Sequence, residues 1–170
     1  MNEKDEELDV TGVASSTQLD ELYRSIGIYI FEFSRLDDTL KCAASSLLGL
    51  SDEQYDGIMP AIDFVTACNL CKAQIIALLP DDKATAEALD LLNKCLKTNE
   101  DRNRVAHGFW FSASRSFASI HSSRTSFKQG LYFREPGELT RKATEIRSLR
   151  ESIWRDIVER ADRLQSDNRA

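Results

Sequence analysis

The sequence predicts an all-α fold, a bundle of four main helices with a small β-hairpin inserted between the third and the fourth. In four long stretches, apolar residues recur every three or four positions, which is the spacing of one helix face. Between about residues 109 and 134, aromatic clusters around a serine-rich centre favour a β-hairpin or small meander instead. A chain of 170 residues is one ordinary domain. We assign residues 16–166 to it, and we expect residues 1–15 to be a disordered acidic tail and residues 167–170 a frayed one.

The first helix is predicted to have Ser16 or Thr17 as its cap and to end before Gly49. Its apolar stripe consists of Leu19, Leu22, Ile26, Tyr29, Phe33, Leu36, Leu40, Ala43 and Leu47. Within it, residues 26–33 are apolar on nearly every face, and such a segment is normally buried on all sides. In a domain this small we expect a second copy of the chain to cover it, so the sequence predicts a homodimer.

Proline and aspartate residues divide the middle of the chain. A second helix is predicted from about Asp63 to Leu79, where Pro80 stops it. Asp81 or Asp82 then caps a third helix, which ends near residue 107.

The last helix follows a Pro-Gly break and is predicted from about residue 139 to Leu164. It is rich in arginine, and acidic residues lie three or four positions from several of these, as Glu151 does from Arg147 and Arg155. We interpret them as surface ion pairs, each worth a few tenths of a kcal/mol, rather than as a free basic stripe.

The four cysteines invite a zinc or redox interpretation because Cys68 and Cys71 form a CxxC pair. A structural zinc site normally needs a second close pair of ligands, and Cys42 and Cys95 are isolated. All four fall within apolar helical patterns, where a reduced cysteine behaves as a small hydrophobe. We therefore predict that they pack in the core, and we predict no metal and no cofactor.

The densest polar chemistry lies at the end of the third helix, in the run Arg102-Asn103-Arg104-Val105-Ala106-His107-Gly108. Asn103 and His107 are four residues apart and share one helix face. Arg102 and His107 are separated by about 7.5 Å along the axis, at ~1.5 Å per residue, a phosphate-sized gap between a fixed cation and a titratable imidazole. A simpler interpretation also fits, because cations in a last turn offset the helix dipole and Gly108 suits a left-handed cap.

This run resembles the Arg-x(4–6)-His signature of the HEPN superfamily, in its common form Arg-Asn-x-x-x-His. That superfamily consists of small α-helical domains, many of them metal-independent ribonucleases that dimerise so that two motifs face one cleft. The resemblance implies a HEPN-like endoribonuclease, a homodimer in which Arg102, Asn103 and His107 are catalytic. In such an enzyme His107 transfers protons and Arg102 binds the scissile phosphate. Asn103 orients His107 or the phosphate by hydrogen bonding. It also implies an RNA substrate, a toxin or defence role, and an antitoxin or other regulatory protein as partner.

Basic residues near the motif are candidates for contacts to RNA: Arg104, Arg115, Arg124 and Lys128. The last three lie in the predicted β insert, over about residues 109–134, and would guide a phosphodiester backbone towards the motif. The insert fits a solvated flap equally well. Four serines fall mostly at strand spacing, on what we expect to be its wet face: Ser112, Ser114, Ser116 and Ser119.

The net charge of -6 conceals an uneven distribution. Residues 1–101 carry 8 Lys and Arg against 20 Asp and Glu (-12), whereas residues 102–170 carry 14 against 8 (+6). The basic part suits RNA binding. No apolar run approaches the ~18 residues of a membrane span, and the acidic start is not a secretory signal, so we predict a cytoplasmic protein.

A second function remains open on sequence grounds. It is a non-catalytic HEPN-like helical dimer that serves as an interaction, nucleotide-binding or scaffold module. The intact Arg, Asn and His favour the enzyme, whereas the net acidity and the paired arginines of the last helix favour this alternative.

Overall fold

The computed structural model describes residues 15–79, 82–113, 116–122 and 129–163. Its α-helices are α1 (Ser16–Leu48), α2 (Asp52–Ile58), α3 (Phe64–Leu78), α4 (Lys83–His107) and α5 (Glu138–Ile153). A 3-10 helix, η1 (Met59–Ala61), follows α2, and α5 continues through a π-helical segment, η2 (Trp154–Val158), to Arg163. Three strands lie between α4 and α5: β1 (Phe109–Ala113), β2 (Ser116–Ser122) and β3 (Gln129–Tyr132). Apart from Ser15, both predicted tails lie outside the described residues.

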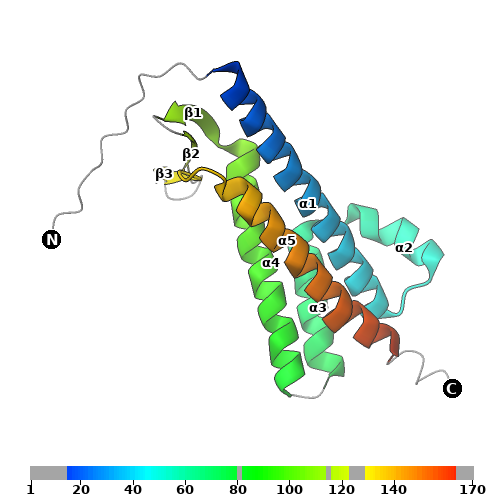
Figure 1. Ribbon diagram of the computed structural model, residues 1–170. Helices are drawn as coiled ribbons and strands as arrows, with labels where there is room; N and C mark the ends of the chain where they lie inside the picture. Colours follow the sequence, from blue (N-terminus) through cyan, green and yellow to red (C-terminus); the bar gives the residue numbers. More distant parts are fainter. Residues whose placement is uncertain (1–14, 80–81, 114–115, 123–128, 164–170) are drawn as a thin grey trace.

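The four long helices form a ring in which each packs against two neighbours (Figure 1). α1 and α4 occupy opposite corners, and α3 and α5 fill the other two. The largest fully buried side chains between them are Tyr29, Leu36, Leu40, Met59, Ile75, Leu92 and Ile153. The mostly helical prediction is confirmed, with the short α2 added to the four main helices. None of the described helices has the length and apolarity that a membrane span requires.

Helix boundaries follow the predicted caps closely. The cap of α1 is Ser15, one residue before the first predicted cap, and it forms a capping box with Gln18. Gly49 ends α1 in the left-handed conformation, with φ 68°. Of the two aspartates proposed for α4, Asp82 is the cap, and its Oδ1 accepts a hydrogen bond from the Thr85 backbone N–H at 2.8 Å.

The cysteines lie where the sequence places them. Cys68, Cys71 and Cys95 are fully buried, and Cys42 is half-buried. Burial raises the pKa of the Cys71 thiol to about 12, and the hydrogen bond with Cys68 together with burial raises the pKa of Cys95. Within the described ranges, no group of three or more His, Cys, Asp or Glu is placed to hold a metal ion.

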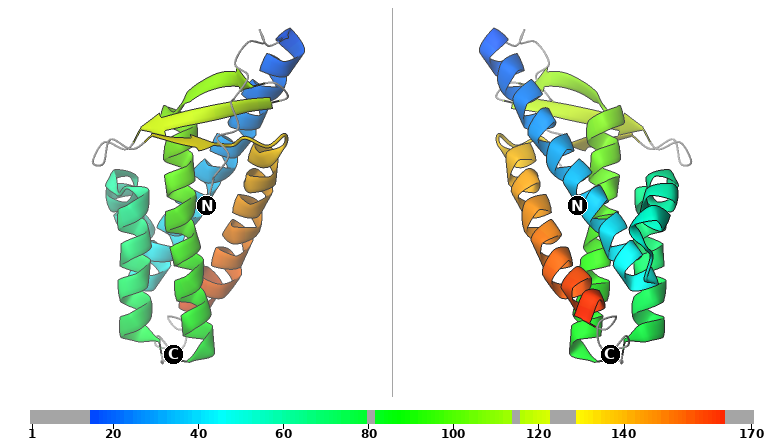
Figure 2. Two further views of the ribbon diagram at one scale, coloured as in Figure 1. Left: turned by 90° about the vertical axis from the view of Figure 1, so that its left-hand side faces the viewer. Right: turned by 90° about the vertical axis from the view of Figure 1, so that its right-hand side faces the viewer.

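The β insert is the small meander, one of the two predicted forms, rather than the hairpin. It is a three-stranded antiparallel sheet in the order β1-β2-β3, and Figure 2 shows it across the end of α4. The expected wet face is wrong for Ser119, which is fully buried against α4. Phe133, directly after β3, belongs to the hydrophobic core. The insert therefore packs against the helical bundle through Ser119 and Phe133 and is not a solvated flap.

Several arginines of the last helix are paired, though with other partners than expected. The Arg147 guanidinium donates to Glu32 Oε1 of α1, with Nη2 at 2.6 Å, instead of to Glu151. Arg155 donates to Asp156, its neighbour in sequence. The Glu32 side chain is only 3 % exposed, so its ion pair with Arg147 fastens α5 to α1.

The burial of three thiols predicts their reactivity. With native protein at pH 8, Ellman's reagent should react promptly with no thiol other than Cys42, because a buried thiol of raised pKa offers little thiolate. All four thiols should react once the chain is unfolded, and Cys42→Ser should remove the native reaction. Prompt reaction of two or more thiols in the folded protein would show that the core assignment of Cys68, Cys71 or Cys95 is wrong.

Candidate functional site

The motif residues Arg102, Asn103 and His107 lie in the last turns of α4, beyond the centre of the bundle. α4 extends beyond the level at which α3 begins and runs up to the sheet (Figure 2). At Asn99 its inward face becomes polar, and the Asn99 side-chain oxygen is buried without a hydrogen-bond partner in the described part of the chain. The three predicted catalytic residues follow within two turns of this point.

Arg102 is held against the core by an aromatic ring. Its guanidinium carbon lies 5.1 Å from the centroid of the Phe33 ring in α1, a cation–π distance. Phe33 in turn stacks on Phe64 of α3, with ring centroids 4.7 Å apart. Among the described residues, no carboxylate and no hydrogen-bond acceptor pairs with Arg102. The structure therefore presents an oriented, half-buried cation whose N–H donors are unused.

Asn103 and His107 lie one turn apart on the outer side of α4. Asn103 is half-buried and His107 is exposed. Neither makes a hydrogen bond to another described residue, and none joins Arg102, Asn103 and His107 to one another. The helix thus offers an amide, an imidazole and a guanidinium on adjacent rows, all available to a ligand.

Arg104, the next residue along, is in a different situation. Its guanidinium donates to Asp101 at 2.7 Å and to Glu100 at 3.3 Å, and it lies 4.4 Å from the centroid of the Tyr132 ring. Burial alone would lower the pKa of Arg104, but the hydrogen bond to Asp101 and the surrounding negative charge raise it above the usual value. Asp101 also accepts from Lys142 of α5 at 2.7 Å. Arg104 therefore joins α4 to the sheet and α5, and its charge is compensated.

The other predicted RNA contacts, Arg115, Arg124 and Lys128, lie outside the described residues. Their contribution to a basic surface beside the motif stays a prediction.

The end of α4 is closed by the sheet, which corrects the cap proposed from sequence. Gly108 is extended, with φ -76° and ψ 151°, rather than left-handed. Its N–H donates to the Arg104 carbonyl at 2.9 Å, and the Ser119 hydroxyl donates to the same oxygen at 3.3 Å. The Trp110 indole N–H donates to the Val105 carbonyl at 3.1 Å. The Gly108 bond is the last ordinary bond of the helix, and the Ser119 hydroxyl adds a second donor to the same carbonyl. The Val105 carbonyl is one that the helix end leaves without an intrahelical partner, and the indole satisfies it.

Large apolar side chains are exposed on α1 and directly after the motif. Tyr23 and Phe31 of α1 are 64 % and 60 % exposed, and Phe109, two residues after the motif histidine, is 71 % exposed. On a helix of 3.6 residues per turn, the directions of the half-buried Ile26 and Ile30 around the helix axis lie between those of Tyr23 and Phe33. We define the α1 surface as Tyr23, Ile26, Ile30 and Phe31.

Comparison with models of protein families, with curated proteins and with solved structures finds no match to this chain. The HEPN resemblance therefore stays a prediction that rests on the motif residues and on their place in a mostly helical fold.

Sequence reasoning identified Arg102 but not the residues that position it. Phe33 belongs to the predicted apolar stripe of α1, and nothing in that stripe indicates that its ring carries a guanidinium 69 positions later. Ser119 was assigned to a wet face, although it closes the motif helix. The one available signal was Gly108, because glycine marks close backbone approach as well as left-handed turns.

Gly108→Ala should destabilise the fold. An added Cβ would collide with the Arg104 carbonyl and the Ser119 hydroxyl, and the carbonyl cannot move without unwinding the helix end. We expect a loss of ~1–3 kcal/mol in the free energy of unfolding, measured by urea denaturation. Gly57→Ala is the matched control, since nothing lies within 4 Å of a Cβ built at Gly57 in α2, and it should be neutral or stabilising. Equal stability of the two variants would contradict the tight closure.

Proposed function

We propose that this chain is a metal-independent endoribonuclease with a HEPN-like site, in which Arg102, Asn103 and His107 act at the interface of two copies. The observation that carries the proposal is the contrast between two arginines of one helix. Arg104 is compensated by Asp101 and Glu100, whereas Arg102 lies on the Phe33 ring with no acidic partner among the described residues. A cation held in this way suits an anionic ligand, and the exposed imidazole of His107 lies five residues further along the helix.

The chemistry follows from the groups present. His107 as general base removes the proton of a ribose 2′-hydroxyl, and the 2′-oxygen attacks the adjacent phosphorus. The bond from phosphorus to the 5′-oxygen breaks as an acid protonates that oxygen. Arg102 binds the non-bridging oxygens with its planar fork and stabilises the additional negative charge of the transition state. The products are a 2′,3′-cyclic phosphate and a 5′-hydroxyl.

One chain supplies one motif histidine, whereas the reaction needs both a base and an acid. A second copy would supply the second imidazole if the two motifs face one another. The α1 surface supports such a dimer, because Tyr23 and Phe31 leave large apolar side chains exposed to water on the helix that carries Phe33. In a two-fold symmetric dimer the same surface serves both chains.

His107→Ala should abolish RNA cleavage while the fold survives. Loss of an acid–base group lowers the rate by about 10²- to 10⁴-fold, and loss of a helix-end charge costs only ~0.3–1 kcal/mol of stability. His121→Ala is the matched control, since it removes the chain's other histidine and should leave the rate unchanged. Cleavage of a labelled RNA panel in EDTA, followed by end-group analysis, gives the measurement.

Arg102→Lys sharpens this test. It keeps the charge but loses the planar fork, so cleavage should fall strongly while the melting temperature changes little. RNA cleavage that persists in His107→Ala, or that requires a divalent metal ion, would contradict the mechanism. Wild-type protein that dimerises and leaves all RNAs intact would instead support the non-catalytic interaction, nucleotide-binding or scaffold module.

Tyr23→Glu should separate the dimer and remove cleavage with it. The substitution places a charge on the proposed interface, and a buried unpaired charge is strongly unfavourable. Light scattering at micromolar concentration should report a dimer for wild type and a monomer for this variant. The control is Ile76→Glu on α3, since Ile76 is a comparably exposed apolar residue, at 67 %, outside the α1 surface. A wild-type monomer, or dissociation by both variants alike, would exclude α1 as the interface.

A further inference from the structure

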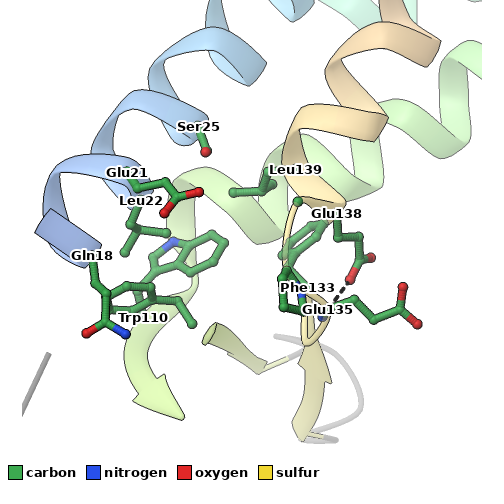
Figure 3. A pocket seen from close by; sticks show the side chains of 12 residues that line it. Gln18, Glu21, Leu22, Ser25, Trp110, Phe133, Glu135, Glu138 and Leu139 are labelled. Carbon is green, nitrogen blue, oxygen red and sulfur yellow. Dashed lines mark hydrogen bonds between the residues drawn. The ribbon is translucent and has the colours of Figure 1, made fainter. Parts of the chain in front are cut away.

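A cavity of about 160 Å³ lies between the first turns of α1, the sheet and the start of α5. It is far larger than the ~10–15 Å³ that one water molecule needs. Three aromatic residues, Trp110, Phe117 and Phe133, contribute to its wall. Figure 3 shows the carboxylates of Glu21 and Glu138 on either side of Trp110 and Phe133. We propose that this cavity binds a guanidinium group, independently of the ribonuclease activity.

The aromatic wall is fixed before any ligand arrives. The Trp110 indole is held by its hydrogen bond to the Val105 carbonyl, and it stacks on Phe133 with centroids 5.7 Å apart and planes 18° apart. Phe133 has a φ of 58°, the left-handed conformation that bulky side chains rarely adopt. Strained backbone conformations of this kind are found at ligand-binding sites, where the surrounding structure holds a side chain in one position. Here it accompanies the stacking of the Phe133 ring on Trp110.

The charge of the cavity selects a cation. Its lining contains Glu21, Glu135 and Glu138, and no basic residue among those described. Glu135 pairs with Arg141 at 3.1 Å, so its charge is compensated. Glu138 accepts only the Glu135 backbone N–H, at 3.5 Å, and Glu21 has no hydrogen bond or ion pair with another described residue. Two carboxylates therefore remain for a ligand, and they would repel the phosphates of RNA.

A guanidinium group fits this combination better than an ammonium ion. It is planar, stacks on aromatic faces, and donates two parallel hydrogen bonds to a carboxylate. The Trp110–Phe133 wall offers the stacking surface, and Glu21 and Glu138 offer the acceptors. The ligand is either a free guanidino compound or the arginine side chain of a partner protein.

Butylguanidinium and its neutral isostere butylurea test the proposal. Trp154→Phe leaves Trp110 as the only tryptophan, so its fluorescence reports binding. Butylguanidinium should change the emission saturably and raise the melting temperature, whereas butylurea should do neither. In this background, Glu21→Gln and Glu138→Gln should each weaken binding about tenfold, since each removes one charged partner. Glu87→Gln, at the far end of α4, is the control and should change nothing.

A capped arginine, N-acetylarginine amide, distinguishes the two sources. Tighter binding than butylguanidinium indicates a side chain of a partner protein, and weaker binding indicates a free guanidino compound. The proposal is overturned if butylguanidinium gives no saturable change up to millimolar concentration. It is equally overturned if butylurea binds as well, or if both glutamine variants, folded by circular dichroism, bind like the parent.

Discussion

The arrangement of this protein depends on how the carbonyl groups at the end of α4 find partners. A helix end leaves its last carbonyls without intrahelical bonds, and here side chains of the sheet supply donors. The Trp110 indole binds the Val105 carbonyl, and the Ser119 hydroxyl adds a second bond to the Arg104 carbonyl, which already accepts from Gly108 in the helix. The same contacts fix the direction of the motif helix and the position of the cavity wall. Both proposed sites therefore share one structural support.

The charged residues on the two sides of α4 differ in whether they have partners of opposite charge. On one side, Asp101 links Arg104 to Lys142, so that the helix, the sheet and α5 are tied by compensated charges. On the other side, Arg102 rests on Phe33 and keeps its hydrogen-bond donors for a ligand. Tyr29 lies in the core nearby and donates to the Thr98 carbonyl at 3.4 Å. Burial, and then the charge of Asp101, raises the pKa of its hydroxyl, which stays protonated and structural.

Local patterns in the sequence predict the helices well because the helix is a local structure. The apolar stripe of α1, the aspartate cap of α4 and the buried cysteines all follow from spacing over one or two turns. The partner of Arg147 could not be predicted in this way, because Glu32 lies 115 positions earlier and the local candidate, Glu151, was the obvious choice. The left-handed Phe133 has no signal at all, since its conformation depends on the ring that it meets.

The candidate site was predicted in part for the same reason. Arg102, Asn103 and His107 are neighbours in sequence, so one helix brings them together, whereas Phe33 and Ser119 are brought to the motif only by the fold. Whether two motifs face one another depends on how two copies of the chain dock. The single chain indicates such docking only through its exposed apolar side chains.

In the proposed dimer, one cleavage site needs histidines from two chains, and mixed dimers can reveal this. This requirement is tested most directly by mixing wild-type protein with an excess of His107→Ala, allowing the subunits to exchange, and measuring cleavage at saturating RNA. A shared site predicts that activity per wild-type chain collapses as mixed dimers form, because each mixed dimer has one motif histidine. Activity per wild-type chain that stays constant would contradict the account, since it would place the whole site within a single chain.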